Sequence, residues 1–349
     1  IGGGNTGRNA AIVRSNYLTP EGVKFYDASV KLFEDLSQEL DLNLFYSNRG
    51  HFTLAHSEAS MRTMRWRAEV NKHVGVDSRV VGRDEIGKAC PQMDLDCSGQ
   101  APIEGALYHN PGSIARHDGV AWGYARGAGQ FGVDIIQMTE VQDIDVRGGQ
   151  VHGVQTSKGY IATETVLSAV AGFTPRVTDM VDIKTPITVH PLQACVSEPM
   201  KPWLDTIIVS GSLHVYVSQS SRGELVMGSS LDPYELHSTR STFDFVEGLT
   251  SHIVDMFPFL SNIKVVRQWG GMADLTPDFA PIMGKTPIKG FYLDAGWGTW
   301  GFKATPISGK TMAATIANDK AHDLIHSFRL SRFEEYELTG EKGAASVGH

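Results

Sequence analysis

The chain has 349 residues, of which 41% are hydrophobic and 20% are charged, so it is long and apolar enough to bury the core of one large or two ordinary domains. The formal net charge of -8 argues against nucleic acid or an anionic membrane as the main partner. No apolar run approaches the roughly eighteen residues of a membrane helix. The three cysteines form no C-x-x-C pair, which favours a reducing, cytoplasmic location and argues against a metal site.

The chain opens on a glycine-rich segment in which Gly2, Gly4 and Gly7 fit the spacing G-x-G-x-x-G. A dinucleotide fingerprint needs a strand before it and a helix after it. No strand precedes Ile1 in this sequence, and polar residues follow at Arg8 and Asn9. We therefore interpret the segment as a loop that approaches a cofactor or an anion closely, with Arg8 and Arg14 as its charges.

The next segment predicts a long helix that starts at Thr19-Pro20 and carries apolar residues at three- and four-residue steps to Leu40. This places Asp27 within a helix and not at a strand end, where a ribose-binding carboxylate would lie. Residues 44–46 and 51–55 flank a Ser-Asn-Arg-Gly turn and predict a hairpin. A charged helix is expected over 57–74.

The middle of the chain predicts a helix over 118–131 that leads into a strand at 133–137. A three-stranded meander should follow. Its strands are expected at 140–146, 151–156 and 160–163. The apolar run 165–170 then returns to a parallel sheet, with a turn at 171–172.

The remaining sequence predicts a separate, mostly antiparallel layer over about 184–268, with strands at 214–218 and 224–227 and a helix near 243–256. Beyond it we expect a strand at 291–295. A glycine-punctuated loop should cover 296–303, and a helix 308–318.

Four segments together resemble the D-amino-acid-oxidase-like flavoenzymes. They are the opening Gly-Gly-Asn-Thr-Gly-Arg-Asn, the meander that ends in Val166-Leu-Ser-Ala-Val170, Leu275-Thr-Pro-Asp-Phe-Ala-Pro-Ile-Met-Gly284, and Gly296 to Lys303. Within that group the chain is most similar to the β-subunit family of heterotetrameric sarcosine oxidases. This similarity covers nearly the whole chain and is strongest at 12–18, 114–118, 190–193, 214–219 and 296–299.

The resemblance implies an α/β fold in which a Rossmann-like FAD-binding domain is interleaved with a mostly antiparallel α+β substrate domain. The flavin-binding part is expected to comprise 1–56, 112–180 and 272–349, and the substrate and partner part 57–111 and 181–271. In the family the dinucleotide fingerprint lies before the position of Ile1. We therefore expect this FAD-binding domain to lack its N-terminal strand, turn and helix.

The resemblance also implies a function, the oxidative demethylation of sarcosine to glycine. Electrons would pass from non-covalent FAD to covalent FMN and then to O2, giving H2O2, with tetrahydrofolate as the one-carbon acceptor. Alpha, gamma and delta subunits would be partners, and the tetrahydrofolate and NAD sites would lie on those other subunits.

By this resemblance Arg14 and Lys303 grip the substrate carboxylate. A guanidinium fork and an ammonium would fix that carboxylate and hold the N-methyl carbon over the flavin. A positive pocket would also favour the neutral amine that hydride release requires. The alternative is a surface arginine and a solvated lysine.

His117 matches the histidine that carries covalent FMN in the family, and Arg116 the basic residue beside it. An imidazole nitrogen would attack the flavin 8α-methyl carbon, and nearby positive charge would stabilise the reduced flavin. The alternative is a residue of the helix start without chemistry. Val226 stands where monomeric relatives carry an oxygen-activating lysine, which fits electrons leaving FAD for FMN.

The other cofactor residues implied by the resemblance fall into three groups. The flavin-covering loop comprises Gly3, Gly4, Asn5, Thr6, Arg8, Asn9 and Ile12. The glycine-rich segment near the C-terminus adds Gly298, Thr299 and Gly301. Val141 would contact the adenosine side of FAD, and His190, His214 and Arg267 the region around FMN, although each of these could be an ordinary strand or core residue.

Two other functions stay open. One is a dehydrogenase of the same fold that acts on another secondary amine or on dimethylglycine and passes electrons to a carrier. The other is a non-catalytic subunit that serves only in assembly.

Overall fold

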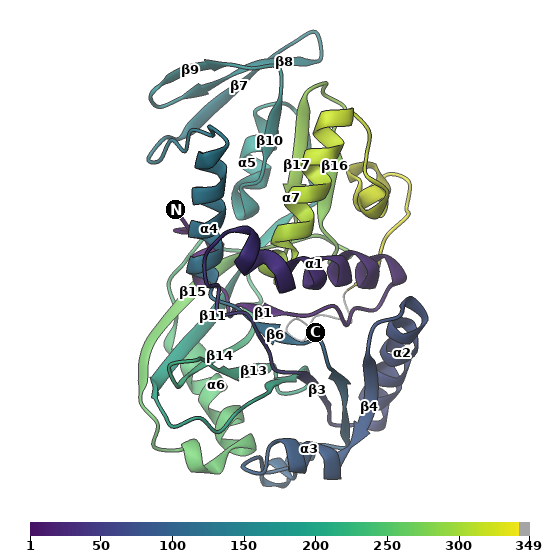
Figure 1. Cartoon of the computed structure of the whole chain (residues 1–349), viewed down its shortest axis with the longest axis vertical. Helices are drawn as coiled ribbons and strands as arrows, with labels where there is room; N and C mark the ends of the chain where they lie inside the picture. The colour runs from purple at the N-terminus through teal and green to yellow at the C-terminus, as the bar shows by residue number, and fades with distance from the viewer. Residues whose placement is uncertain (342–349) are drawn as a thin grey trace.

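A computed structural model describes residues 1–341 of the chain. Its largest element is an eight-stranded sheet in the lower half of Figure 1. Only β12 and β3 pair in parallel in this sheet, and its other neighbours are antiparallel. Its strands in spatial order are β15 (Val265–Leu275), β11 (Thr188–Pro199), β14 (Glu224–Leu231), β13 (Val215–Gln219), β12 (Ile207–Ser210), β3 (His51–Ala55), β5 (Gly105–His109) and β4 (Ser78–Gly82).

Three helices pack on this sheet because each buries an apolar stripe. α6 (Phe243–Met256) buries Phe245, Leu249, Ile253 and Met256, which recur at three- and four-residue steps. α2 (Glu58–Val74) contacts β3, β4 and β5, and α3 (Arg83–Ala89) contacts β4 and β5. α3 and α6 share one apolar core with the sheet, whereas α2 packs Met61, Met64 and Ala68 on Ala55 and Leu107 in a separate cluster.

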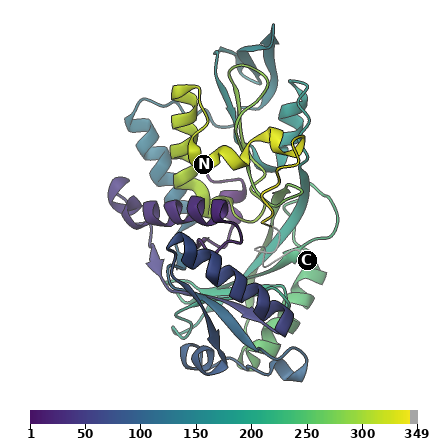
Figure 2. The ribbon, with the colours of Figure 1, turned by 90° about the vertical axis from the view of Figure 1, so that its right-hand side faces the viewer.

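The upper half of Figure 1 contains a smaller sheet in which β17 (Phe291–Ala295) lies between β10 (Val166–Ser168) and β16 (Ile282–Lys285). β10 and β17 are parallel, which confirms the predicted return of the chain to a parallel sheet. α7 (Gly301–Asn318) packs on this sheet, and α1 (Pro20–Glu39) crosses the middle of the molecule in Figures 1 and 2. This parallel and antiparallel arrangement confirms the expected α/β class.

The remaining strands form two small three-stranded sheets. The meander β7 (Val141–Arg147), β8 (Gln150–Thr156) and β9 (Gly159–Ala162) forms its own sheet, as predicted. α4 (His117–Gln130) and α5 (Thr174–Asp179) are the remaining helices, and a small sheet joins β1 (Ile12–Val13), β6 (Ser113–Ile114) and β2 (Ser47–Asn48).

The predicted helix start at Thr19-Pro20 is confirmed. Thr19 is the N-cap of α1, its Oγ1 accepts a hydrogen bond from the Gly22 N–H at 3.1 Å, and Pro20 takes the first helical position. Asp27 lies within α1 and pairs with Lys31 one turn later at 2.7 Å. A ribose-binding role for Asp27 is therefore excluded by its place in the fold.

One predicted strand and one predicted hairpin are wrong, whereas the strand predicted at 51–55 is confirmed as β3. Residues 133–137 form no strand, because none of the strands described in residues 1–341 pairs with them. Val133, Ile135 and Ile136 are exposed instead. The hairpin at 44–46 and 51–55 is also absent, since β2 pairs with β6 whereas β3 pairs with β5 and β12.

The helix predicted at 308–318 begins earlier, at Gly301, so that Lys303 lies in a helix and not in a loop. Pro306 lies inside this helix and has no N–H to bond the carbonyl of Phe302. In the structure Thr305 Oγ1 donates to that carbonyl at 2.8 Å and replaces the missing bond. α7 therefore continues through the proline.

The opening glycines form no nucleotide fingerprint. Residues Asn5–Arg8 make one 3-10 turn, and the first strand, β1, comes after it. A Cβ atom on Gly7 would lie 2.3 Å from the Gly2 carbonyl oxygen. Gly7 is thus required by the tight packing of the loop on itself.

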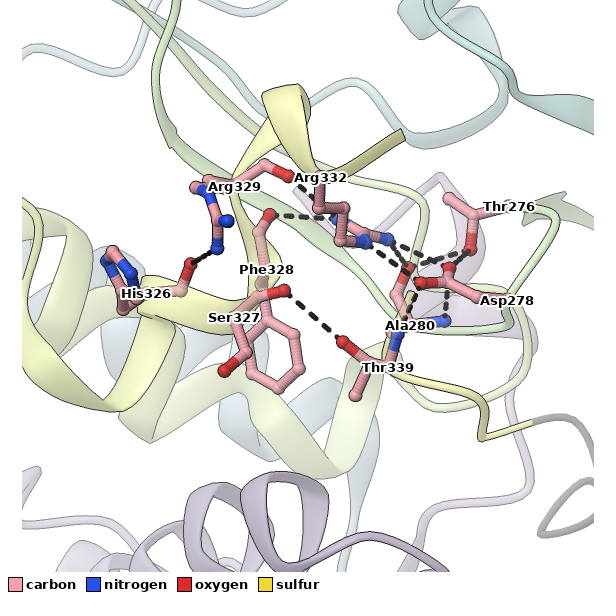
Figure 3. Close-up of polar contacts among 9 residues, drawn as sticks. All are labelled: Thr276, Asp278, Ala280, His326, Ser327, Phe328, Arg329, Arg332 and Thr339. Atoms are coloured by element: carbon pink, nitrogen blue, oxygen red, sulfur yellow. Dashed lines mark hydrogen bonds and ion pairs between the residues drawn. The ribbon is translucent and has the colours of Figure 1, made fainter. Parts of the chain in front are cut away.

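A buried ion pair fastens the end of the described chain to the loop after β15 (Figure 3). Arg332 donates to both Asp278 oxygens at 2.9 Å, from Nε and from Nη2. Its other donors reach the carbonyls of Ala280, Phe328 and Arg329 at 2.9–3.2 Å. All five guanidinium donors of Arg332 are therefore satisfied.

The three cysteines, Cys90, Cys97 and Cys195, are free thiols and all are buried. None of the helices within residues 1–341 is long and apolar enough to cross a membrane. The predicted domain bounds remain a prediction. The large sheet takes β3 from the segment 1–56 and part of β15 from the segment 272–349.

Candidate functional site

A cavity of about 470 Å³ lies between the large sheet and the body formed by the opening loop, β17 and α7. This volume is in the range of small-molecule and cofactor sites. The sheet contributes residues of β3, β11, β12, β13 and β15 to its wall. Ten predicted site residues also line it: Asn5, Thr6, Arg8, Asn9, Ile12, Arg14, Gly298, Thr299, Gly301 and Lys303.

The opening loop is fixed against the sheet by main-chain hydrogen bonds. The Asn5 side chain donates to the Met272 carbonyl at 2.6 Å and accepts from the Met272 N–H at 3.0 Å. Arg8 folds back on the loop and donates to the carbonyls of Gly3 and Gly4. The loop thus forms a stable wall of the cavity although it contains little regular structure.

Arg14 follows β1 directly and is 5% exposed. Its Nη1 donates to Asn16 Oδ1 at 2.8 Å, and its guanidinium lies 4.8 Å from the centre of the Tyr17 ring. These contacts hold a permanent cation at the cavity wall. The alternative of a surface arginine is therefore wrong.

Lys303 lies on the same cavity wall and is 7% exposed, so it is not a solvated lysine. The Ser29 hydroxyl of α1 donates to the Lys303 carbonyl at 2.6 Å, which positions the first turn of α7. Burial lowers the pKa of Lys303 well below its usual 10.5, and the charge of Arg14 lowers it further. Two buried cationic groups in one cavity favour an anionic ligand.

The glycine-rich segment after β17 wraps around Asp274. Asp274 Oδ2 accepts the N–H groups of Gly296 at 2.7 Å and Trp297 at 3.2 Å, and the Asp274 carbonyl accepts the Gly298 N–H at 3.0 Å. Gly296 and Gly298 have φ of +71° and +53°, the left-handed region that favours glycine. Burial raises the pKa of Asp274 to about 7 although these N–H groups oppose the shift.

Asp294 is a second carboxyl group on the cavity wall and is half-buried. It accepts hydrogen bonds from Trp297 Nε1 at 2.8 Å and from Ser308 Oγ at 2.5 Å. Burial raises its pKa to about 6, against these two hydrogen bonds. Asp274 therefore holds the backbone of the loop that faces the cavity, and Asp294 holds the side chains of Trp297 and Ser308.

His117 and Arg116 lie outside this cavity, at the start of α4. Arg116 is exposed and forms a two-pronged ion pair with Asp118. Asp118, and not His117, accepts the N–H of Gly119 at 2.8 Å. His117 is half-buried and is the first residue of α4, the place that the helix-start alternative gives it.

The other predicted residues do not line the cavity. Gly3 and Gly4 lie beside it and hold Arg8 through their carbonyls. Val141 is exposed at the start of β7, and Arg267 is exposed on β15. His190 Nδ1 lies 3.0 Å from the Asp232 carbonyl, a satisfied polar contact of the kind left open by the sequence.

Sequence reasoning missed four polar groups that line the cavity: His51, Tyr216, Asp274 and Asp294. A signal existed for His51, which begins the otherwise apolar strand His51–Ala55, in which all five residues are buried. No spacing rule would have found Asp274, because its hydrogen-bond partners lie more than twenty residues along the chain.

Comparison with known proteins supports one family throughout. The family model described as FAD dependent oxidoreductase matches residues 1–315. The chain is 43% identical to the sarcosine oxidase subunit beta of Arthrobacter sp, over 100% of this chain and 86% of that protein. It is 41% identical to the subunit of the same name from Rhodobacter capsulatus, over 100% of this chain and 84% of that protein.

Among solved structures, L-proline dehydrogenase from P. horikoshii is similar with a TM-score of 0.91 and 23% identity. The similarity covers 97% of this chain and 90% of that chain. At this identity the comparison shows the fold alone.

Proposed function

The chain belongs to the family of FAD dependent oxidoreductases, and from this premise we propose that it oxidises the N-methyl group of sarcosine, as the β subunit of a sarcosine oxidase. Glycine and a one-carbon unit at the formaldehyde level would be the products. The one-carbon unit would be released by hydrolysis or passed to tetrahydrofolate bound elsewhere in the complex. Alpha, gamma and delta subunits are the proposed partners, with NAD and tetrahydrofolate on those subunits.

The observation that carries the proposal is the pair of buried basic side chains that line one cavity, Arg14 and Lys303. A carboxylate is the one strongly charged group that remains on sarcosine when its amine is neutral. Arg14 would bind that carboxylate through its fork and Lys303 through a point charge. The same positive charges disfavour an ammonium, so the bound amine loses its proton, as hydride release requires.

The residues around the cavity fit a flavin ring. The loop Gly296–Gly301 presents main chain to the cavity, because Asp274 holds it through N–H groups and glycine occupies its two left-handed positions. His51 Nε2 has no hydrogen-bond partner in the described chain and lies on the cavity wall, which indicates that a bound group completes the site. Bound FAD would supply the two-electron acceptor for hydride from the N-methyl carbon.

We propose His117 as the attachment point of covalent FMN, which would supply the electron path to O2 and so to H2O2. Burial lowers the pKa of His117 below its usual 6.5. Asp118 raises this pKa and Arg116 lowers it again. The ring is therefore neutral at neutral pH, the form in which an imidazole nitrogen is a nucleophile. Arg116 supplies positive charge next to it.

Covalent flavin is expected to remain with the protein after precipitation by acid. The wild-type pellet should be yellow, whereas His117→Asn should give a colourless pellet and a yellow supernatant. His152→Asn, which changes an exposed histidine of β8, is the matched control and should stay yellow. A colourless wild-type pellet would overturn the assignment of His117.

Binding of a carboxylate is expected to take up a proton through Lys303. The lowered pKa of Lys303 means that the ammonium loses its proton at a lower pH than usual, and a bound anion shifts that pKa up again. Methoxyacetate is a carboxylate without an amine. Its affinity should therefore fall as pH rises through the pKa that Lys303 has in the ligand-free protein. Calorimetry in two buffers of different ionisation enthalpy measures the uptake.

The control for this experiment is Lys303→Met, which should bind methoxyacetate more weakly and without proton uptake. Equal proton uptake in wild type and Lys303→Met would contradict the role of Lys303.

Oxygen consumption separates an oxidase from a dehydrogenase with the same fold. With sarcosine, the complex should consume O2 and form H2O2 without an added electron carrier. Activity only with an artificial carrier would favour the dehydrogenase, and absence of flavin absorbance would favour a subunit that serves only in assembly.

A further inference from the structure

One ring nitrogen of His51 has no hydrogen-bond partner in the described chain. It is fully buried at the start of β3, and its side chain lines the cavity. Its Nδ1 lies 3.4 Å from Thr53 Oγ1, whereas Nε2 has no hydrogen-bond partner within residues 1–341. A buried polar atom left without a partner carries the full desolvation penalty of that group. A ligand in the cavity is the natural partner for Nε2.

The neighbouring histidine shows what a purely structural histidine looks like in this fold. His109 pairs with His51 across β3 and β5 and is equally buried. Its Nε2 accepts the Ser15 N–H at 3.1 Å, and its Nδ1 donates to Ser78 Oγ at 2.8 Å. His109 does not line the cavity, and both of its ring nitrogens are used within the protein.

The charges around His51 keep its ring neutral. Burial lowers the pKa of His51 well below its usual 6.5, and Arg14, His109, Arg67 and Lys303 lower it further. A neutral ring carries one proton; in the tautomer with that proton on Nδ1, Nδ1 donates to Thr53 Oγ1 and Nε2 carries the lone pair. Nε2 is then a hydrogen-bond acceptor in a cavity that is otherwise rich in cationic donors.

We propose that His51 Nε2 accepts the single N–H of a neutral secondary amine whose carboxylate is held by Arg14 and Lys303, and that this contact selects secondary over tertiary N-methyl amino acids. The inference rests on the proposed function. The contact occupies the N–H and leaves the nitrogen lone pair available to assist hydride release. A neutral tertiary amine such as N,N-dimethylglycine has no N–H, so it would leave Nε2 unpaired.

The test is the ratio of kcat/KM for sarcosine to kcat/KM for N,N-dimethylglycine, measured in the flavin-loaded complex. His51→Leu should lower kcat/KM for sarcosine by a factor of about 10 to 100 and that for N,N-dimethylglycine much less. The ratio should therefore fall by about a factor of ten or more. His51→Gln should keep most of the ratio, because its side-chain oxygen can accept at a similar reach.

Binding of methoxyacetate, a carboxylate without an N–H, shows whether the carboxylate site is intact and should be unchanged in His51→Leu. Thr53→Val is a second variant that removes the acceptor of Nδ1, and it should also lower the ratio. If the two kcat/KM values fall together and the ratio stays constant in every folded variant, His51 is only structural and the inference is wrong. If the wild-type complex oxidises neither amine, the proposed function itself fails.

Discussion

Replacing Arg14 by methionine is expected to lower kcat/KM for sarcosine by about two to three orders of magnitude, because it removes the fork that binds the substrate carboxylate in a buried site. Arg14 is 5% exposed, so bulk water cannot fully replace the hydrogen bonds and charge that its guanidinium offers the carboxylate. Lys303 would remain as a single cation opposite the carboxylate. Steady-state kinetics of the flavin-loaded complex measure the change.

Two variants separate this effect from unfolding. Arg14→Lys keeps the charge and loses the fork, so its kcat/KM should lie between those of wild type and Arg14→Met. Arg126→Met removes a surface arginine that pairs with Asp41, and its kcat/KM should equal that of wild type. A value within threefold of wild type in Arg14→Met would show that the carboxylate binds elsewhere.

Replacing Arg332 by methionine is expected to lower the free energy of unfolding by about 3–5 kcal/mol, since it leaves the buried carboxylate of Asp278 without its counter-charge. Burial would raise the pKa of Asp278, but Arg332 overrides this and holds that pKa below its usual value. The five hydrogen bonds that Arg332 donates are also lost, including those to Ala280 and Phe328 (Figure 3). Denaturant unfolding at neutral pH measures the difference.

The neighbouring Arg329 is the matched control for Arg332. It pairs with Glu335 and Glu337, whose side chains are 43% and 65% exposed. Arg329→Met should cost less than about 1 kcal/mol, as is usual for ion pairs near the surface. If Arg332→Met and Arg329→Met lower the free energy of unfolding equally, burial of the Arg332–Asp278 pair does not determine how much that pair stabilises the fold.

Helices with a cap and a regular apolar stripe could be predicted from sequence. Thr19 and Pro20 mark the start of α1, and the stripe from Phe245 to Met256 defines α6, because both signals act within a few residues. The strand expected at 133–137 could not be judged in this way. A strand exists only with a partner, and the partner is set by the whole fold.

The hairpin prediction failed for the same reason. The turn at Arg49-Gly50 suggested that the two flanking segments pair with each other. In the structure β2 pairs with β6, which lies more than sixty residues further along the chain, and β3 pairs with strands of the large sheet. The residues of the turn therefore predicted where the chain reverses, but they could not predict which strands pair.

The site was predictable where the sequence resembles the family. Arg14 and Lys303 were expected to act together, and the fold brings both to one cavity wall. Asp274 was not found, because its role is to accept main-chain N–H groups from a distant loop. His51 was not found either, since a single histidine in an apolar strand is most often a structural residue.

Anaerobic addition of sarcosine to the flavin-loaded protein tests the central claim most directly. The account predicts that the visible absorbance of oxidised flavin is lost in wild type and is retained in Arg14→Met at the same sarcosine concentration. Full retention of that absorbance in wild type, with flavin bound and the carboxylate site able to bind methoxyacetate, would contradict the assignment of sarcosine as substrate.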